Sequence, residues 1–286
     1  MSYADKLFKE TSWDIINNGF SSEGFEVRAK WEDGTPAHTM KQFCVVHRYD
    51  LRKEFPAITV RQIYLKSCFD EILWIWQKKS NNIKDLHSKI WNQWADEEGS
   101  IGTVYGYQVA EQFRSNIVGG KYIDQIDYVR WQLKNTPFSR RIMTNLYQYH
   151  NLYTGHLDPC AYSMTYNVTN EHREDGKLTL NAILNQRSQD MLAANGWNVA
   201  QYALLLMMLA QEANMVPGIL VHVIADCHIY DRHIPLVKEL LDREEYPAPT
   251  VYLNPEITNF YDFTTDDLIV ENYKFGEQLK NIPIAV

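Results

Sequence analysis

The chain has 286 residues, of which 45% are hydrophobic, and its formal net charge is −8. A chain of this length and composition can bury one large core or two small ones. The acidic balance argues against a general nucleic-acid binder, because affinity for a phosphate backbone depends on many Lys and Arg contacts.

Two further classes are excluded by the cysteines and by the apolar runs. The four cysteines have no metal-ligand spacing and are too few for a disulfide framework: Cys44, Cys68, Cys160 and Cys227. The longest apolar segment, residues 202–210, is about nine residues long, whereas a membrane span needs roughly 20. No apolar signal stretch follows Met1. We therefore expect a soluble cytoplasmic protein that needs no metal.

No Pro/Gly/Ser-rich linker interrupts the chain, which favours a single domain over residues 1–286. In the first half, apolar spacing predicts a helix over residues 3–18 and another over 62–80. Between them, residues 23–50 predict strands joined by a loop. A further helix is expected over residues 122–135, before Pro137.

The middle of the chain predicts a β-hairpin. Residues 161–168 and 178–184 alternate between apolar and polar, and residues 174–177 have turn composition. Cys160 then stands at the start of the first strand, and Arg187 stands just past the end of the second. Since a hairpin brings these two ends together, we expect Cys160 and Arg187 to share a site.

The second half predicts the most apolar helix over residues 197–214, ended by Gly218, and a buried strand over 219–224. A helix over 233–243, a short strand over 250–253 and an irregular end from residue 275 follow. Helices and strands mix without strict alternation, which indicates an α+β fold.

Cys160 and Arg187 together suggest a chemistry. A thiol is a nucleophile only as thiolate, and a nearby arginine lowers its pKa. Arginine also suits a phosphate, which it holds by paired hydrogen bonds. The two residues predict a phosphorylated substrate that is attacked by sulfur. The 18 Tyr and 8 Trp fit either a well-packed core or a flat ligand, with about even weight.

Other candidate residues are each open to two interpretations when taken alone. Arg140 and Arg141 fit a solvated pair or a phosphate clamp. Glu71 fits a helix edge better than a buried acid of raised pKa. His228 and Tyr230 point to one side of a strand, as core-edge residues or as ligand contacts. Asn198 fits an N-cap, or a donor and acceptor for a heterocycle.

Taken together, these residues resemble the thymidylate synthase family, folate-dependent enzymes that methylate dUMP. The resemblance covers the chain from about Asp14 to Val286. The motifs that carry it are Glu71-Ile72-Leu73-Trp74, Ile90-Trp91-Asn92-Gln93-Trp94-Ala95-Asp96, Gly102-Thr103-Val104-Tyr105-Gly106, Ser139-Arg140-Arg141, Asp158-Pro159-Cys160, Gln186-Arg187-Ser188-Gln189-Asp190, Trp197-Asn198-Val199 and Asp226-Cys227-His228-Ile229-Tyr230. Details around Val27 and Asp33 look most like the bacillus and phage branch.

The resemblance implies a single domain with a large mixed sheet flanked by helices, paired sheet to sheet in a homodimer. It implies that Cys160 attacks C6 of the uracil ring, that Glu71 relays protons and that Tyr105 helps to remove the C5 proton. The dUMP contacts that it implies are Arg28, Gln186, Arg187 and Ser188 around the phosphate, Arg140 and Arg141 from the other subunit, Asn198 at the uracil, and His228 and Tyr230 at the ribose.

For the co-substrate 5,10-methylenetetrahydrofolate, the resemblance implies contacts from Asp190, Trp91 and Trp94. It also implies that the C-terminal residues Ile284, Ala285 and Val286 close over the folate. Arg61 stands where the family usually has a lysine near the folate tail. No metal is implied.

The chain departs from the family pattern at three places. Ala161 follows the cysteine where many members have histidine, and Ala225 replaces a common glycine. The run Ala193-Ala194-Asn195-Gly196-Trp197 replaces the commoner Leu-Gly-Leu-Pro-Phe. These changes border the pyrimidine and folate pockets.

Three other functions compete with dUMP methylation. A dUMP hydroxymethylase of the same fold would quench the adduct with water instead of hydride. Hydroxymethylases that use dCMP carry aspartate in place of the asparagine, so Asn198 points to dUMP. RNA binding is a secondary alternative, which the net charge of −8 disfavours. A cysteine hydrolase would need a histidine base beside Cys160, and His228 is the candidate.

Overall fold

The computed structural model describes residues 1–152, 154–155 and 157–285. Its α-helices are α1 (Tyr3–Asn18), α2 (Leu65–Ile72), α3 (Gly106–Ala110), α4 (Gln125–Asn135), α5 (Asn195–Glu212) and α6 (Ile234–Asp242). Its strands are β1 (Phe20–Ser21), β2 (Thr39–Asp50), β3 (Gln112–Ser115), β4 (Lys121–Asp124), β5 (Met143–Asn145), β6 (Ala161–Thr169), β7 (Thr179–Asp190), β8 (Val216–Tyr230), β9 (Thr250–Leu253) and β10 (Leu268–Glu271).

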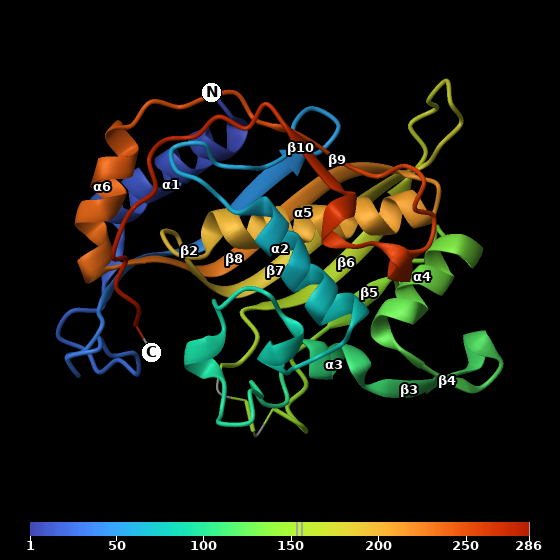
Figure 1. The fold of residues 1–286 in the computed structure, drawn as a ribbon, viewed down its shortest axis with the longest axis horizontal. Coiled ribbons are helices and arrows are strands. Elements are labelled where there is room, and N and C mark those ends of the chain that lie inside the picture. The colour runs from blue at the N-terminus through green and yellow to red at the C-terminus, as the bar shows by residue number, and fades with distance from the viewer. Residues whose placement is uncertain (153, 156, 286) are drawn as a thin grey trace.

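The main sheet has six strands in the order β1-β2-β8-β7-β6-β5 (Figure 1). Strands β7 and β8 pair in parallel, whereas the other neighbours pair antiparallel, so the sheet is mixed. The parallel pair needs a crossover, and α5 supplies it. Two small ribbons, β3-β4 and β9-β10, lie outside this sheet. The expected α+β fold with a mixed sheet and flanking helices is confirmed.

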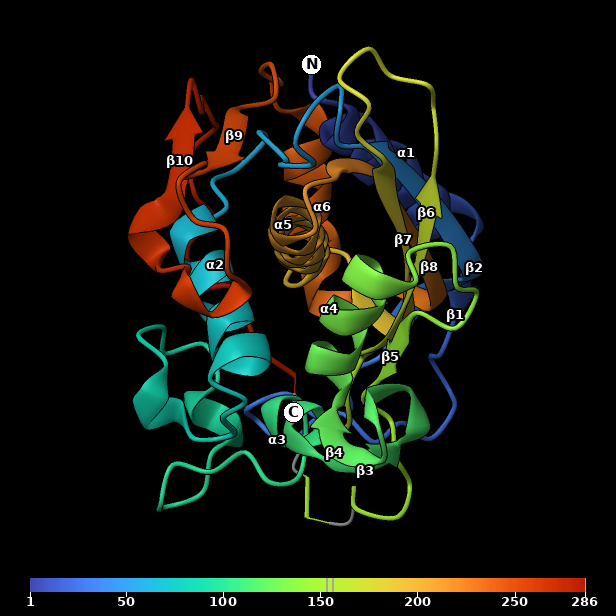
Figure 2. The same cartoon turned by 90° about the vertical axis from the view of Figure 1, so that its right-hand side faces the viewer.

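The core lies between the sheet and α5, the helix whose sequence is apolar on nearly every side. Figure 2 shows α5 between α2 and the sheet, and its residues 203–206 are completely buried. A helix that is apolar all round is stable only when packed on all sides. Helix α1 packs on the same face of the sheet as α5. Thr11 Oγ1 of α1 lies 2.8 Å from Nε2 of His47 in β2. His47 is registered with His222 in β8, so the two histidines point to the same face of the sheet.

The other face of the sheet carries an apolar strip that is partly exposed to solvent. Val46 of β2 and Ile183 of β7 are 55% and 40% exposed. The strand register places both beside Val221 and Val223 of β8, which are half-buried. An apolar strip of this kind along paired strands marks an interaction surface.

Most predicted elements are confirmed, with differences at their ends. The helix over 3–18, the hairpin and the strand over 250–253 are present. Within 23–50 only residues 39–50 form a strand, and the helix expected from residue 122 begins at Gln125, because residues 121–124 pair as β4. Gly218 does not end the apolar helix, which stops at Glu212; Gly218 is part of β8.

One tight approach positions a side chain that matters below. A Cβ on Gly106 would lie 2.0 Å from the carbonyl oxygen of Ser80, so only glycine fits there. The preceding residue, Tyr105, has a φ of +46°, a region that costs free energy for a non-glycine residue. The packing of Gly106 on residue 80 therefore fixes the backbone of Tyr105.

No helix in the described part of the chain combines the length and the apolar character needed to cross a membrane.

Candidate active site

Cys160 ends the loop before β6 and lies against Arg187, as expected. The backbone N–H of Arg187 donates to the carbonyl of Cys160 at 2.9 Å. The Arg187 side chain donates from Nε to the carbonyl of Pro159 at 3.0 Å and from Nη2 to that of Asp158 at 2.6 Å. Arg187 is part of β7, and not beyond its end as the sequence suggested. The guanidinium thus holds the loop that presents the thiol.

The thiol is not activated by the arginine alone. Burial raises the pKa of Cys160, and Asp158 raises it further, whereas Arg187 and Arg28 lower it. The net pKa is above its ordinary value because burial outweighs the two guanidinium groups. The pKa lowering expected from the sequence is therefore overcome by the cost of placing a thiolate in an enclosed site.

Tyr105 contacts the nucleophile directly. Its hydroxyl oxygen accepts the backbone N–H of Cys160 at 3.1 Å, and its ring lies edge-on to Trp91 at 5.1 Å. Burial raises the pKa of Tyr105 well above its usual value, so the phenol stays protonated at neutral pH. The hydroxyl hydrogen then remains free to be donated toward the site.

Glu71 is buried, with 4% of its surface exposed, although the sequence alone favoured a helix edge. Burial raises the pKa of its carboxyl, and Asp70 raises it slightly. Hydrogen bonds from Gln201, Trp91 and Trp197 lower it, the last from the indole Nε1 to Oε2 at 2.9 Å. The result is an acid whose pKa lies above its ordinary value, as a proton relay requires.

An enclosed cavity of about 30 Å³ joins these groups. It holds roughly one water. Its lining residues are Glu71, Ile72, Ile75, Trp91, Tyr105, Cys160, Ala161, Asn198, Gln201 and Tyr202. Nucleophile and acid therefore border the same small space.

The orientation of Asn198 follows from one carbonyl group. Gln186 Nε2 lies 3.1 Å from the carbonyl of Ser188, which can only accept, so this atom is the amide nitrogen. The same nitrogen donates to Asn198 Oδ1 at 3.0 Å. Asn198 Nδ2 then donates to Gln201 Oε1 at 3.0 Å, which leaves it one N–H for a ligand. Asn198 lies in the second turn of α5 and is not an N-cap; Ala194 is.

The same chain of bonds fixes His222, which the sequence analysis did not single out. Gln186 Oε1 can only accept, so the Nε2 of His222, 2.8 Å away, carries a hydrogen. Burial and the neighbouring His47 lower the pKa of His222 to about 3, which keeps the ring neutral. A histidine at a buried position of an apolar strand is the signal that sequence reasoning passed over.

Parallel pairing brings a second group of predicted residues together. Ser188 of β7 is registered with Asp226 of β8, and Asp190 with His228. His228 Nδ1 lies 2.8 Å from Asp226 Oδ1, and the His228 and Tyr230 rings lie 5.1 Å apart. The expected placement of His228 and Tyr230 on one side of the strand is confirmed.

Asp190 is linked to the C-terminal segment by a residue that the sequence did not reveal, His233. Asp190 Oδ2 lies 3.4 Å from His233 Nδ1, and His233 Nε2 donates to the carbonyl of Pro283 at 2.8 Å. Burial alone would raise the pKa of Asp190, but His233 and His228 lower it overall. Ala285, two residues beyond Pro283, is half-buried, and Val286 lies outside the described residues.

The remaining predicted folate residues lie in two places. Trp91 contacts Trp94 with ring centroids 5.5 Å apart, and Trp91 also borders the cavity. Arg61 is buried, and its Nη2 donates to the carbonyl of Leu192. Burial lowers the pKa of Arg61. In this state Arg61 therefore braces the loop before α5.

Three predicted phosphate ligands are exposed. Arg28 lies in the loop between β1 and β2, close enough for its charge to act on Cys160. Arg140 and Arg141 lie in the turn before β5. Within the described residues, neither guanidinium of this pair has an ion pair or side-chain hydrogen bond. The solvated interpretation of the pair thus fits the single chain.

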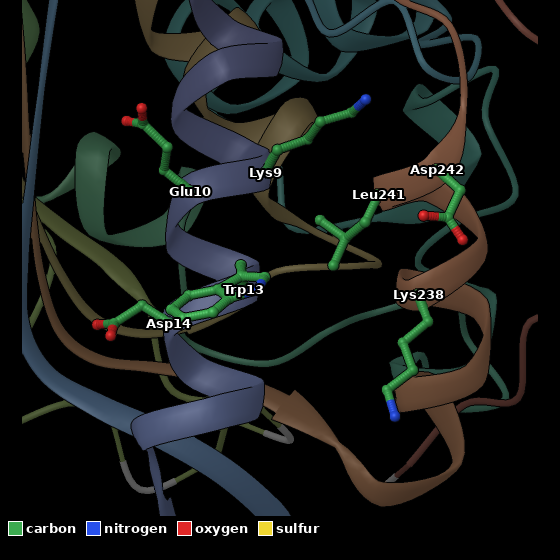
Figure 3. Close-up of a pocket in the computed structure, with 7 residues that line it drawn as sticks. All are labelled: Lys9, Glu10, Trp13, Asp14, Lys238, Leu241 and Asp242. Carbon is green, nitrogen blue, oxygen red and sulfur yellow. The ribbon is translucent and has the colours of Figure 1, made fainter.

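A second, open hollow of about 690 Å³ lies between α1 and α6 (Figure 3). Its walls carry charges of both signs around Trp13 and Leu241. None of its lining residues borders the Cys160 cavity. In the described ranges no group of three or more His, Cys, Asp or Glu residues is placed to hold a metal ion.

Comparison with known proteins agrees with this geometry. The family model described as thymidylate synthase matches residues 6–286. The chain belongs to the thymidylate synthase family. It is 42% identical over 283 residues to thymidylate synthase 1 of Bacillus subtilis (strain 168), covering 98% of each chain. It is equally similar, over the same shares, to the thymidylate synthase of Bacillus phage phi3T.

A solved structure extends the likeness to three dimensions. The thermostable thymidylate synthase A from Bacillus subtilis superposes with a TM-score of 0.91 at 41% sequence identity, and the match covers all of both chains. The chain is therefore a thymidylate synthase by sequence and by fold, and its activity is the methylation of dUMP to dTMP.

The raised thiol pKa gives a first prediction. In a Cys44→Ser background, which removes the exposed thiol, alkylation of Cys160 by iodoacetamide should be slow at neutral pH and still rise above pH 9.0, because only the thiolate reacts. Arg187→Leu should slow it further below the thiol pKa, since loss of the positive charge raises the pKa of Cys160. Intact-mass spectrometry gives the rates, with Cys160→Ser as control. A plateau below pH 9.0 would contradict the assigned burial effect.

Proposed function

We propose that the cavity between Cys160 and Glu71 is where this chain converts dUMP to dTMP, with 5,10-methylenetetrahydrofolate as co-substrate. The observation that carries the proposal is a nucleophilic thiol and a buried acid on one small cavity, with Arg187 bonded to the loop that presents the thiol. Uracil C5 is a poor nucleophile until a nucleophile adds at C6. Cys160 is the group placed for that addition.

The pKa values of the free protein suit this order of events. Cys160 is mostly a thiol before substrate binds, and Arg187 and Arg28 already favour its ionisation. Addition of the thiolate to C6 places negative charge on C5 and O4 of the ring. The folate supplies the one-carbon unit and the hydride. Glu71 exchanges protons at the ring oxygen, and the Tyr105 hydroxyl assists removal of the C5 proton.

We assign the nucleotide contacts by the polarity of each group. Arg28, Arg187 and Ser188 hold the phosphate, with Gln186 behind them. The free N–H of Asn198 donates to O4 of uracil, where cytosine would present a donor instead. His228 and Tyr230 bind the ribose hydroxyl, and Asp226 orients His228.

We assign the folate contacts to residues around Asp190 and Trp91. Asp190 meets the pterin, and Trp91 and Trp94 offer ring faces to it. The bond from His233 to the carbonyl of Pro283 supports closure of the C-terminal segment, with Ala285, over this site. Arg61 serves the folate side through the loop at Leu192.

We further propose a homodimer that pairs the uncovered sheet faces. The exposed side chains of Val46 and Ile183 support it, because each becomes buried in such a pairing. Arg140 and Arg141 then reach the phosphate in the partner's site. Four free cysteines, with Cys44 exposed, support the cytoplasm as the compartment.

The reaction is tested by mixing protein, dUMP and 5,10-methylenetetrahydrofolate. Absorbance at about 340 nm should rise as dihydrofolate forms, and the product should be dTMP by mass. Cys160→Ala should abolish turnover while dUMP binding, measured by calorimetry, weakens little, because the phosphate contacts stay. A hydroxymethyl product without an absorbance rise would indicate the hydroxymethylase instead.

The assignment of Asn198 predicts a change in base selectivity. Asn198→Asp should relax the preference for dUMP over dCMP, because a protonated or ionised carboxyl alters the donor and acceptor pattern at the ring. The ratio of kcat/KM for the two nucleotides measures it, with Asn195→Asp one helical turn earlier as the control. An unchanged ratio would remove Asn198 from base reading.

The dimer proposal predicts complementation. Cys160→Ala and Arg140→Glu proteins should each be inactive, and a refolded equal mixture should recover roughly a quarter of wild-type activity. Half of the dimers are then hybrids, and each hybrid has one complete site. Activity that stays at the level of the separate variants would mean that Arg140 acts within its own subunit.

A further inference from the structure

The contact between Trp197 and Glu71 has no role in the assignments above. The indole Nε1 of Trp197, in the first turn of α5, donates to Glu71 Oε2 at 2.9 Å. An indole N–H can only donate, so Oε2 must be an acceptor in every state of the carboxyl. This bond favours a proton on the other oxygen, Oε1, because the carbonyl oxygen of a protonated carboxyl is the better acceptor.

The local sequence brings the indole into place. Gly196, directly before Trp197, packs so closely that an added Cβ would lie 3.0 Å from Cδ1 of both Ile58 and Ile63. This close approach seats the start of α5 against the segment that leads into α2, where Glu71 lies. Gly196 and Trp197 both belong to the run 193–197 in which the chain departs from the family pattern.

The carboxyl also accepts hydrogen bonds from an amide and from a second indole. Trp91 is that second indole and Gln201 is the amide, and both lower the pKa of the carboxyl. Of the described residues that line the cavity, none is a histidine, and the residue after the nucleophile is Ala161. Trp197 is the donor to Glu71 whose geometry is a well-formed hydrogen bond.

We propose that Trp197 is a positioning residue for the proposed proton relay: its N–H holds Oε2 of Glu71, so that protons pass through Oε1, and it stabilises the ionised carboxylate. The proposal rests on the role given to Glu71 under the proposed function. It assigns to the unusual 193–197 run a part in the chemistry and not only in loop packing.

The titratable groups around Glu71 do not provide the same effect. Asp70 and Cys68 lie on the same helix, and Asp70 opposes ionisation. Tyr105 and Tyr202 face the carboxyl from the loop before α3 and from α5, and burial keeps both phenols protonated. Cys160 borders the same cavity. None of these groups is a cation that could stabilise the Glu71 carboxylate if the hydrogen bond from Trp197 were removed.

The test removes the indole N–H while keeping an aromatic ring at position 197. Trp197→Phe removes the donor, and Phe is the commoner family residue at this position, so the variant should fold. A second variant carries benzothienylalanine at position 197, which has the shape of tryptophan with sulfur in place of N–H. Trp13→Phe, at an exposed position of α1, is the matched control.

The readout is the titration of Glu71 in the free protein, followed by its carboxyl band in infrared difference spectra. The band that is missing in Glu71→Gln identifies the residue. In both Trp197 variants the midpoint should move to higher pH by about one unit, because a hydrogen bond to a buried carboxylate is lost. The kcat should fall roughly tenfold, with a smaller change in KM for dUMP, since the bond acts on the chemical step.

The outcomes separate the two proposals. An unmoved midpoint, or one that moves to lower pH, overturns the role of Trp197 while leaving that of Glu71 in place. Full activity in Glu71→Gln overturns both. A midpoint that moves upward in the Trp197 variants and stays in Trp13→Phe, together with an inactive Glu71→Gln, supports both.

Discussion

The parallel pairing of β7 and β8 in the middle of the sheet is the constraint on which the site depends. It sets Gln186, Ser188 and Asp190 beside Ile224, Asp226 and His228 in register. A parallel pair requires a crossover, and the crossover is α5, which carries Trp197 and Asn198 over the same strands. One topological feature thus brings the residues near the thiol, the amide of Asn198 and the indole of Trp197 to one end of the sheet.

Burial is the dominant electrostatic influence in that space. It raises the pKa of Cys160 and of Glu71 against the charges and hydrogen bonds that act in the other direction. An enclosed site disfavours the charged form of both groups until a ligand supplies charge or displaces water. The arginines beside the thiol then act as an anion site first and as an aid to ionisation second, which links phosphate binding to activation of the nucleophile.

The buried polar side chains form a chain with a single direction. It starts at the carbonyl of Ser188 and passes through Gln186 to Asn198 and Gln201, with neutral His222 on the remaining oxygen of Gln186. Because a backbone carbonyl cannot reverse its role, each amide in the chain has one allowed orientation. Selectivity for uracil therefore depends on the main-chain carbonyl of Ser188 in β7, outside the helix, as much as on Asn198 itself.

Patterns local in sequence determined much of this protein. The composition of the hairpin turn predicted that Cys160 and Arg187 lie together. The alternation of apolar and polar residues predicted β6 and β7. Eight motifs in order indicated the family, and with it the fold and the reaction. Properties that depend on contacts between distant segments came only from the tertiary structure. Burial of Glu71, the net pKa of Cys160, the links from His222 and His233, and the bond from Trp197 each join residues far apart in the chain. Periodicity reports which face of an element is apolar, but it does not say which atoms of another element meet that face, and pKa values and hydrogen-bond direction depend on those atoms.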